Sequence, residues 1–475
     1  MIEKRQFYID GAWVNPAAPR DLDVIDPSTE EPCAVISLGD QADTDAAVAA
    51  ARAAFDGWAA TPPEDRVALL RKLYEIYKSR AAEMGSAISK EMGAPIDYAN
   101  ANQVGAGIWH MGGFFKALEG FRFESDFTAT EKHLKEPIGV CGLITPWNWP
   151  MNQVVLKVFP ALAAGCTVVL KPSEVAPLSS LLFAEFVDQA GFPKGVFNLV
   201  NGDGSGVGTQ LSKHRDVDMI SFTGSTRAGI AISKAAADTL KRVSLELGGK
   251  GANIIFADAD EDAVKRGARH CFANSGQSCN APTRMLVERS RYDAAIETAV
   301  QVAEATRVGP ASEAGKFIGP VVSEVQFDKI QKLIETGMQE ARLVAGGPGR
   351  PEGLNRGYFV RPTVFADVSN DMTIAQEEIF GPVLSIQPFD SEDEAVAIAN
   401  DTPYGLADYV QTRDDDKRRR VARRLRAGMI ETNGQGFAQG SPFGGYKQSG
   451  NGREGGAHGL DEFLEVKAVS GWAAE

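Results

Sequence analysis

Cysteine and histidine are both scarce in this chain. It has five of each among 475 residues, no two cysteines have CxxC spacing, and the histidines are scattered. Protein sites for zinc and similar metals need clustered Cys or His ligands, so the sequence predicts no metal site. An odd number of cysteines without a secretion signal also favours a reducing compartment, and we expect a cytoplasmic protein.

Long apolar runs and an excess of basic charge are lacking as well. The longest apolar stretch, 154–170, contains Lys157, Pro160 and Gly165, and it is too broken for a membrane span. The first ten residues have no apolar centre of the kind found in signal peptides. The net charge is −14, whereas nucleic-acid binders usually carry a basic surface. The basic cluster at 417–424 fits the solvated face of a helix. We therefore expect neither a membrane nor a nucleic acid as a partner.

The composition is that of a globular protein with two or three domains. Hydrophobic residues make up 44% and charged residues 24% of the chain. Helices are predicted at 43–60 and 63–80, after a hairpin that turns at Asp10-Gly11. From Gly139 onward, short apolar runs alternate with helical patterns, which predicts a parallel sheet with ligands bound at its carboxyl edge. Its strands are predicted at 140–144, 167–170, 196–200, 219–222 and 243–247.

A second alternating region, 252–432, predicts a second α/β domain. The glycine-rich segment 434–456 contains aromatic residues and is predicted to be an ordered loop. One further strand is predicted at 465–469. Because it follows the second domain, it is free to pair elsewhere, including with another subunit.

Cys279 lies in the most informative segment, Phe272-Ala-Asn-Ser-Gly-Gln-Ser-Cys279-Asn-Ala-Pro-Thr-Arg284. Small and polar neighbours between Gly276 and Pro282 indicate a fixed and partly open backbone. An ionised cysteine is a strong nucleophile that readily forms thioesters. Free cysteines are more often buried and inert, so this segment alone leaves both interpretations open.

Two further residues have the chemistry of a catalytic site. Asn148 is enclosed by prolines and tryptophans in Thr145-Pro-Trp-Asn-Trp-Pro150, and a rigid amide can donate to an oxyanion. Taken alone, an ordinary turn asparagine is the better explanation. Glu246 lies between two leucines, and apolar surroundings raise the pKa of a carboxyl group and suit a general base. The alternative is a charge at the start of a loop.

Other motifs at predicted strand ends suit a dinucleotide. Lys171 and Glu174 lie on a proline-fixed turn and could hold ribose hydroxyls or form a surface ion pair. The glycine-rich run 202–208 lacks the strict GxGxxG spacing. Ser225 is placed to begin a helix, as an N-cap or beside a phosphate.

Beside a Gly-Pro turn, Glu378 could hold a ribose and Phe380 could face a nicotinamide ring. Together with the thiol, the amide and the base, these motifs supply the parts needed to oxidise a carbonyl through a covalent intermediate.

Seven motifs, in this order along most of the chain, resemble the NAD(P)-dependent aldehyde dehydrogenase superfamily. The sequence of these motifs is most similar to a bacterial subgroup that includes 6-oxolauric acid and 3-succinoylsemialdehyde-pyridine dehydrogenases. The motifs are Thr145-Pro-Trp-Asn-Trp-Pro150, Lys171-Pro-Ser-Glu174, Phe222-Thr-Gly-Ser-Thr226, Leu245-Glu-Leu-Gly-Gly-Lys250, Gly276-Gln-Ser-Cys279, Glu378-Ile-Phe-Gly-Pro382 and Pro442-Phe-Gly-Gly-Tyr-Lys447.

The resemblance implies an α/β protein of three parts. A Rossmann-like cofactor domain is expected at 1–118 and 138–247, and an α/β catalytic domain at 248–440. A small β oligomerisation domain is expected at 119–137 and 441–475. The resemblance also implies a homodimer or homotetramer.

The resemblance assigns Cys279 as the nucleophile, Glu246 as the base and Asn148 as the oxyanion donor. Positions that match cofactor contacts are Ile144, Thr145, Pro146, Trp147, Lys171, Ser173, Glu174, Gly204, Gly208, Phe222, Thr223, Gly224, Ser225, Gly229, Leu247, Glu378 and Phe380. The substrate pocket is expected at Trp149, Gln153, Leu156, Ser278, Asn280 and Phe437.

The implied reaction is oxidation of an aldehyde to an acid through a thiohemiacetal and a thioester on Cys279. A local lowering of the pKa of this thiol is expected. Relatives that form acyl-CoA lack the base, so Glu246 favours hydrolysis by water. Glu174 would repel a 2′-phosphate and favours NAD, although NADP use stays possible.

Some relatives carry a tryptophan where this chain has Leu156, which suggests a roomier tunnel. With aromatic walls from Trp149 and Phe437, we expect a medium or large apolar or aromatic aldehyde rather than a small charged one. The alternatives are a thioester hydrolase, an acyl-CoA-forming semialdehyde dehydrogenase, and a non-catalytic binding protein that retains the fold.

Overall fold

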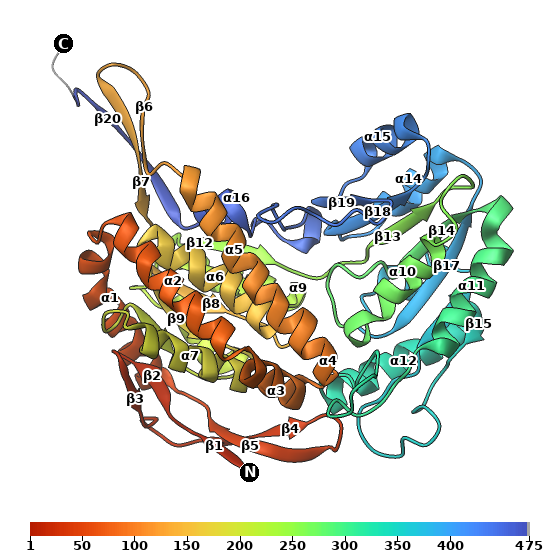
Figure 1. Cartoon of the computed structure of the whole chain (residues 1–475), viewed down its shortest axis with the longest axis horizontal. Coiled ribbons are helices and arrows are strands. Elements are labelled where there is room, and N and C mark those ends of the chain that lie inside the picture. Colours follow the sequence, from red (N-terminus) through yellow and green to blue (C-terminus); the bar gives the residue numbers. More distant parts are fainter. Residues whose placement is uncertain (473–475) are drawn as a thin grey trace.

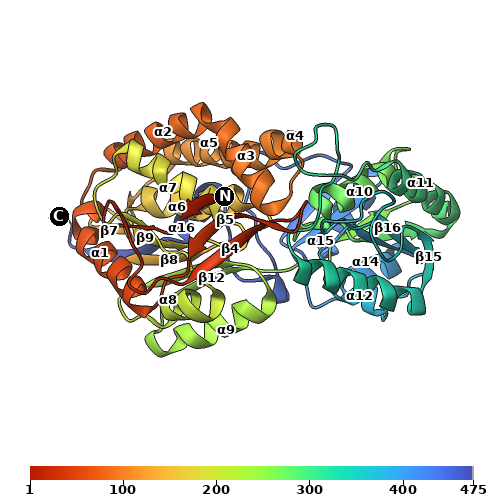
Figure 2. The ribbon, with the colours of Figure 1, turned by 90° about the horizontal axis from the view of Figure 1, so that it is seen from below.

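The protein consists of two α/β lobes that lie side by side, with a small sheet projecting from the first (Figures 1 and 2). The structure is a computed structural model that describes residues 1–472. Each lobe is built on a seven-stranded sheet. The observed architecture confirms the α/β fold class expected from the sequence.

The first sheet contains all five strands predicted after Gly139. Its parallel part has the order β12 (Arg242–Glu246), β11 (Met219–Thr223), β8 (Val140–Ile144), β9 (Thr167–Lys171) and β10 (Phe197–Leu199). The predicted hairpin, β2 (Phe7–Ile9) and β3 (Ala12–Val14), extends this sheet in antiparallel fashion. Its turn residues Asp10 and Gly11 have φ of 51° and 71°, the left-handed values that a tight hairpin turn requires.

Helices cover both faces of this sheet, because its strands are apolar on both sides. One face carries α1 (Gln41–Ala59), α8 (Thr209–Lys213) and α9 (Thr226–Ala236). The other face carries α2 (Pro63–Ser79), α3 (Ala81–Met92), α5 (Val104–Gly120), α6 (Pro150–Ala164) and α7 (Leu178–Ala190). The helices predicted at 43–60 and 63–80 are α1 and α2, so both predictions are confirmed.

The second sheet has a similar plan. Its order is β15 (Arg342–Ala345), β16 (Thr363–Ala366), β17 (Val383–Phe389), β14 (Arg284–Glu288), β13 (Ala252–Ile255), β18 (Ala407–Gln411) and β19 (Met429–Thr432), and only β15 is antiparallel. One face packs against α10 (Ala263–Phe272) and α11 (Tyr292–Ala305). The other packs against α12 (Glu324–Glu340), α13 (Thr373–Gln376), α14 (Glu392–Asn400) and α15 (Asp415–Arg424).

The basic cluster lies on α15 and is solvated, as the sequence predicts. Arg420 and Arg424 form ion pairs with Glu392 on α14. Lys417 pairs with Asp258, with 3.4 Å between Nζ and Oδ1. These contacts are internal to the second lobe, so the cluster forms a helix face with partners in the same lobe.

The projecting sheet pairs β20 (Leu464–Ser470) with β7 (Glu131–Pro137), which in turn pairs with β6 (Glu124–Asp126). The residue pattern left the partner of the last strand open, whereas the resemblance grouped it with 119–137. The register runs from Leu464 opposite Pro137 to Ser470 opposite Glu131, so the partner belongs to the same chain. The sheet extends beyond the helices of the first lobe (Figure 1).

Shorter elements complete the described chain. A three-stranded sheet of β1 (Ile2–Lys4), β5 (Glu31–Ser37) and β4 (Asp21–Asp26) runs below the first lobe toward the second (Figure 2). Two short helices, α4 (Ile96–Tyr98) and α16 (Gly456–Asp461), flank the region between the lobes. Within residues 1–472, no helix is both long and apolar enough to cross a membrane.

Candidate functional site

Cys279 lies where two cavities meet, between the two lobes. The first cavity, of about 210 Å³, is lined by Pro146, Trp147, Asn148, Thr223, Gly224, Ser225, Leu247, Gly248, Cys279, Gln326, Lys329, Glu378 and Phe380. The second, of about 250 Å³, is lined by Ala106, Trp109, His110, Trp149, Asn152, Gln153, Cys279, Asn280, Met429, Phe437, Ser441, Pro442 and Phe443. A thiol at this junction can therefore contact molecules bound on both sides.

The loop before Cys279 has a constrained backbone. Asn274, Ser275 and Gly276 have φ of 52°, 58° and 72°, and two consecutive non-glycine residues in this region are uncommon. A Cβ at position 276 would lie 2.1 Å from the backbone of Gly381, so only glycine fits there. The expectation of a fixed backbone around Cys279 is confirmed.

A network of buried amides connects this loop to Asn148. Gln103 Nε2 donates to Asn148 O at 3.0 Å and to Asn274 Oδ1 at 3.1 Å. Asn274 Nδ2 donates to Asn148 O, and Asn148 Nδ2 donates to Gln277 O, both at 3.0 Å. The bond from Asn148 Nδ2 to Gln277 O holds the side-chain amide of Asn148 against the cysteine loop, and Gln103 Oε1 stays enclosed without a partner among residues 1–472. The sequence reasoning missed Gln103 and Asn274, which lie outside the recognised motifs.

The residues on both sides of Cys279 are also anchored. Trp149 Nε1 donates to Ser278 Oγ at 2.9 Å. Tyr409 on β18 donates its hydroxyl to Asn280 O at 2.6 Å. These contacts fix the cysteine between α6 of the first lobe and the sheet of the second.

The pKa of the Cys279 thiol is raised, which contradicts the expected lowering. Burial is the largest cause, and the carboxylates of Glu378 and Glu246 add to it. The backbone N–H of Cys279 favours the thiolate but is outweighed. A thiolate at this position is costly because burial removes much of its water and its strongest charged neighbours are negative.

Glu246 is buried at the end of β12, with 2% of its surface exposed. Both carboxylate oxygens are enclosed and have no hydrogen-bond partner in the described chain. Burial raises its pKa, and Glu454 raises it further, while Lys157 lowers it. The raised pKa expected from its leucine neighbours is confirmed. The carboxylate lines neither cavity at Cys279.

Lys157 and Glu454 form a buried ion pair next to Glu246, with 2.5 Å between Nζ and Oε1. Lys157 also donates to Ser221 Oγ at 3.2 Å. The ion pair leaves Glu454 Oε2 enclosed and without a partner among residues 1–472. Glu246, Lys157 and Glu454 are therefore three ionisable groups that share one enclosed region.

The residues predicted to bind a cofactor are distributed over two cavities. Eight of them line the first cavity: Pro146, Trp147, Thr223, Gly224, Ser225, Leu247, Glu378 and Phe380. Ile144, Gly204, Gly208 and Phe222 line a further cavity of about 810 Å³ beside α8 and α9. Thr145, Lys171, Ser173, Glu174 and Gly229 line neither cavity.

The turn after β9 is held by Lys171, which is 3% exposed. Its Nζ donates to Pro172 O at 2.8 Å, to Glu174 Oε2 at 3.2 Å and to Gly202 O. The lysine is therefore used to position Glu174, which is only partly buried. The sequence left two roles open for these residues, an ion pair and ribose binding. The structure is compatible with both, because Glu174 pairs with Lys171 and is still accessible beside the glycine-rich run.

The arrangement fits a dinucleotide. Helix α9 begins between the first cavity and the 810 Å³ cavity. Ser225 is its N-cap, and Ser225 Oγ accepts from Ala228 N at 3.3 Å. The start of a helix is a favourable place for a phosphate. Glu378 Oε1 accepts from Gly249 N at 2.8 Å. The ring of Phe380 lies edge-on to Trp147 at 5.4 Å and borders the first cavity.

The predicted substrate pocket is only partly correct. Trp149, Gln153, Asn280 and Phe437 line the second cavity, whereas Ser278 does not line it and instead holds Trp149. Leu156 is wrong as a pocket residue, because it is 1% exposed and lies in the core of the first lobe. From Gln153 onward every residue of α6 is buried, so a position one turn further along is already enclosed.

The second cavity is uncharged. None of the residues lining it is Asp, Glu, Lys or Arg. Burial lowers the pKa of His110 to about 4, so this imidazole is neutral at physiological pH. The residues from α5, Ala106, Trp109 and His110, were missed because their helix gives no motif that marks its ends as part of a site.

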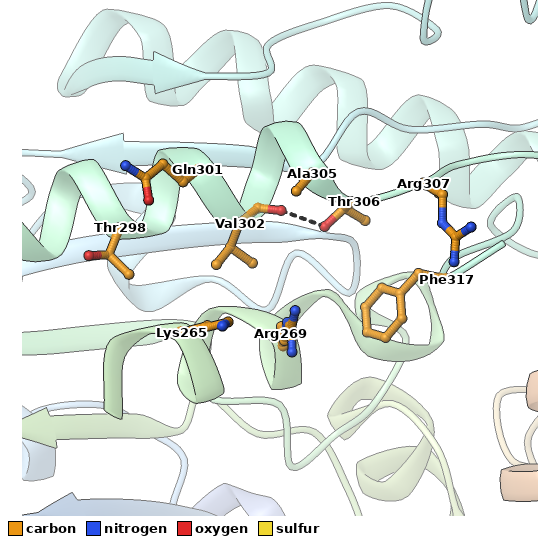
Figure 3. A pocket seen from close by; sticks show the side chains of 9 residues that line it. All are labelled: Lys265, Arg269, Thr298, Gln301, Val302, Ala305, Thr306, Arg307 and Phe317. Carbon is orange, nitrogen blue, oxygen red and sulfur yellow. Dashed lines mark hydrogen bonds between the residues drawn. The ribbon is translucent and has the colours of Figure 1, made fainter. Parts of the chain in front are cut away.

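Another cavity, of about 540 Å³, lies between α10 and α11 (Figure 3). It is bordered by Lys265, Arg269 and Arg307, all exposed, and by Thr306, whose hydroxyl donates to Val302 O at 2.7 Å. It shares no lining residue with the cavities at Cys279. It contains no cysteine or carboxylate, so it does not contribute to the candidate site.

The chain is similar to known proteins over nearly its whole length. Residues 13–469 match the model of the aldehyde dehydrogenase family. The chain is 52% identical over 475 residues to a 3-succinoylsemialdehyde-pyridine dehydrogenase of a Pseudomonas species, covering 99% of each. It is similar to a crystal structure of an aldehyde dehydrogenase from Bartonella henselae, with a TM-score of 0.99, 60% identity and coverage of 99% of this chain and 100% of that one.

A second solved structure is a Pseudomonas syringae aldehyde dehydrogenase C variant in complex with NAD+ and octanal. Its TM-score is 0.98 and its identity 50%, with coverage of 99% of this chain and 97% of that one.

Proposed function

Since the chain belongs to the aldehyde dehydrogenase family and is an enzyme that oxidises aldehydes with a nicotinamide cofactor, we propose that Cys279 is its nucleophile. The observation that carries the proposal is the thiol at the junction of two cavities. One cavity is bordered by dinucleotide-type residues and the other by uncharged aromatic ones. The non-catalytic alternative is therefore set aside.

The proposed reaction begins when the Cys279 thiolate attacks the aldehyde carbon. The carbonyl oxygen then becomes an oxyanion, which needs hydrogen-bond donors at fixed positions. The side-chain amide of Asn148, which also donates to Gln277 O, supplies one donor, and the backbone N–H of Cys279 supplies the other. Removal of hydride from this thiohemiacetal leaves a thioester on Cys279.

Bound NAD+ supplies the hydride acceptor. We propose that Glu378 and Phe380 hold its nicotinamide half and that Glu174, positioned by Lys171, contacts the adenosine ribose. Neighbours solved with this cofactor include the Pseudomonas syringae enzyme and an aldehyde dehydrogenase from Mycobacterium tuberculosis. A carboxylate at Glu174 disfavours the 2′-phosphate of NADP.

We propose that Glu246 activates the water that cuts the thioester. Its raised pKa makes it a good proton acceptor once it is ionised. In its present position it lines neither cavity, so it must turn toward Cys279 to act. The presence of this base argues against transfer of the acyl group to coenzyme A, which needs no ionised water-activating group.

The rate is expected to rise with pH. Burial raises the pKa of Cys279, which attacks as the thiolate and so controls kcat/KM; the raised pKa of Glu246 affects only the later hydrolysis and therefore kcat. From about pH 7 to about pH 9.5, kcat/KM should increase by up to roughly tenfold per unit while one group titrates. Initial rates across this range test the expectation, and a flat or falling profile contradicts it.

Stability must be measured in parallel. A buried carboxyl group with a raised pKa stabilises the fold in its protonated form, and that contribution is lost as pH rises through the folded-state pKa. A thermal melt at each pH separates loss of fold from titration of the site.

We propose that the substrate is a medium or large apolar or aromatic aldehyde. The uncharged second cavity and its aromatic walls support this class, because a charged aldehyde would find no counter-ion there. The named relatives act on or bind molecules of this size, a succinoylsemialdehyde-pyridine and octanal.

An aldehyde panel with NAD and with NADP tests the function. NADH formation should be faster with hexanal, octanal and benzaldehyde than with succinic semialdehyde or betaine aldehyde, by about tenfold or more in kcat/KM. NAD should be preferred over NADP. Faster turnover of the charged aldehydes contradicts the substrate class, and acyl-CoA formation on adding coenzyme A contradicts hydrolysis.

We also propose the domain division stated above, with its last residues, 473–475, lying outside the described chain. The division is supported by the separate sheets. The β20-β7-β6 sheet has two open edges and an exposed Val466, which suits pairing of subunits into a dimer or tetramer. All five cysteines are free thiols, which supports placing the protein in the cytoplasm.

A further inference from the structure

The second cavity contains one polar side chain that the fold leaves unpaired. Gln153 lies on α6, one turn after Trp149, and is 3% exposed. Its Oε1 is enclosed without a hydrogen-bond partner, and its Nε2 makes no hydrogen bond within residues 1–472. Buried amides are normally satisfied, and leaving one unpaired is costly. The end of the amide that is not enclosed, Nε2, is therefore available to a molecule in the cavity.

The orientation of the amide defines which group it can recognise. Only Oε1 is fully enclosed, so Nε2 is the terminal atom that faces the cavity. An amide nitrogen carries two N–H donors and no acceptor. A matching group on the substrate must therefore accept a hydrogen bond.

The surroundings exclude a charged partner. Asn152 and His110 border the same cavity, and the imidazole is neutral because burial lowers its pKa to about 4. The remaining walls are largely aromatic, including Trp149 and Phe437. A carboxylate placed here would lose its water without gaining a cation.

We propose that Gln153 is a specificity-determining residue that binds a neutral acceptor, such as a ketone oxygen, inside the substrate chain. This inference rests on the proposed function and narrows its substrate class from apolar aldehydes to aldehydes with an internal carbonyl. A plain hydrocarbon chain displaces water from Gln153 and leaves both N–H groups unpaired. Sites built to donate hydrogen bonds discriminate against such analogues.

Two pairs of shape-matched aldehydes test the proposal: 4-oxohexanal against 4-methylhexanal, and 5-oxohexanal against 5-methylhexanal. In each pair a ketone oxygen is replaced by a methyl group. The wild-type enzyme should prefer the ketone in at least one pair, by about tenfold in kcat/KM. Gln153→Met, which keeps the volume and removes the amide, should bring that ratio close to one.

A control on the same helix is Leu162→Met, a change of similar volume in the core of the first lobe. It should keep the wild-type preference. NAD binding and a thermal melt show that each variant is folded. The proposal is overturned if the wild-type enzyme shows no preference in either pair, or if Gln153→Met keeps the preference. Failure of the proposed function looks different, because no aldehyde in the panel would then yield NADH.

Discussion

Replacement of Cys279 by alanine is expected to abolish aldehyde oxidation, with kcat falling by about 10⁴-fold or more. In the proposed mechanism the thiol forms the only covalent bond to the substrate, and losses of this size are typical when a nucleophile is removed. Cys279 is the one cysteine that borders the two cavities, since Cys141, Cys166 and Cys271 are fully buried elsewhere. NADH absorbance with the best aldehyde of the panel measures the effect.

The matched control is Cys33→Ser, which removes a half-exposed thiol on β5 away from the site. This variant should retain the wild-type rate. NAD binding to Cys279→Ala, followed by protein fluorescence, shows that the cofactor side of the site is intact. Equal rates for Cys279→Ala and the wild-type enzyme would contradict the assignment of the nucleophile.

The second large effect is expected from Glu246→Gln. The first NADH should still form, because attack and hydride removal do not need the base. Turnover should then slow by about 10²- to 10⁴-fold, since hydrolysis loses its general base. Rapid mixing should show a burst of about one NADH per active site followed by a slow steady rate.

Glu377→Gln is the control for this variant, because Glu377 is exposed and lines neither cavity. It should turn over like the wild-type enzyme. A Glu246→Gln enzyme that shows neither a burst nor a change in steady rate rules out the proposed role of the base. Loss of the burst as well would instead place Glu246 before thioester formation.

The fold could be predicted from the sequence where its signals are local. Strands β8 and β9 have apolar centres with glycine or proline within two residues of their ends, and that pattern is characteristic of a sheet buried on both faces. The residue pattern of β20 alone does not identify its partner, because the pairing with β7 joins residues more than 320 positions apart, and only the resemblance grouped 119–137 with the C-terminal segment. Nothing in either strand alone encodes that register.

The site likewise has features that the local sequence predicts and features that depend on residues distant in the sequence. Cys279 and Asn148 lie in motifs that resemble those of the family. The resemblance assigned both residues to one site and so predicted that they lie close together. Gln103 was missed because its hydrogen bonds reach Asn148 and Asn274, which are distant in sequence. The raised pKa of Cys279 was also missed, since it depends on burial and on Glu378, about 100 positions away.

Leu156 shows the limit of reasoning from a helical face. The resemblance placed Leu156 in the pocket with Gln153, because some relatives carry a tryptophan at its position. The helix enters the core after its first turn, so Leu156 is enclosed while Gln153 borders the cavity. Depth along a helix is set by packing of the whole lobe and cannot be read from periodicity.

The most direct test is to locate the acyl group. Glu246→Gln is mixed with NAD and octanal, stopped with acid, digested and mapped by mass spectrometry. The account predicts an octanoyl group on the peptide that contains Cys279, formed only when NAD is present. An octanoyl group on another residue, or none on any peptide while NADH is formed, would contradict it.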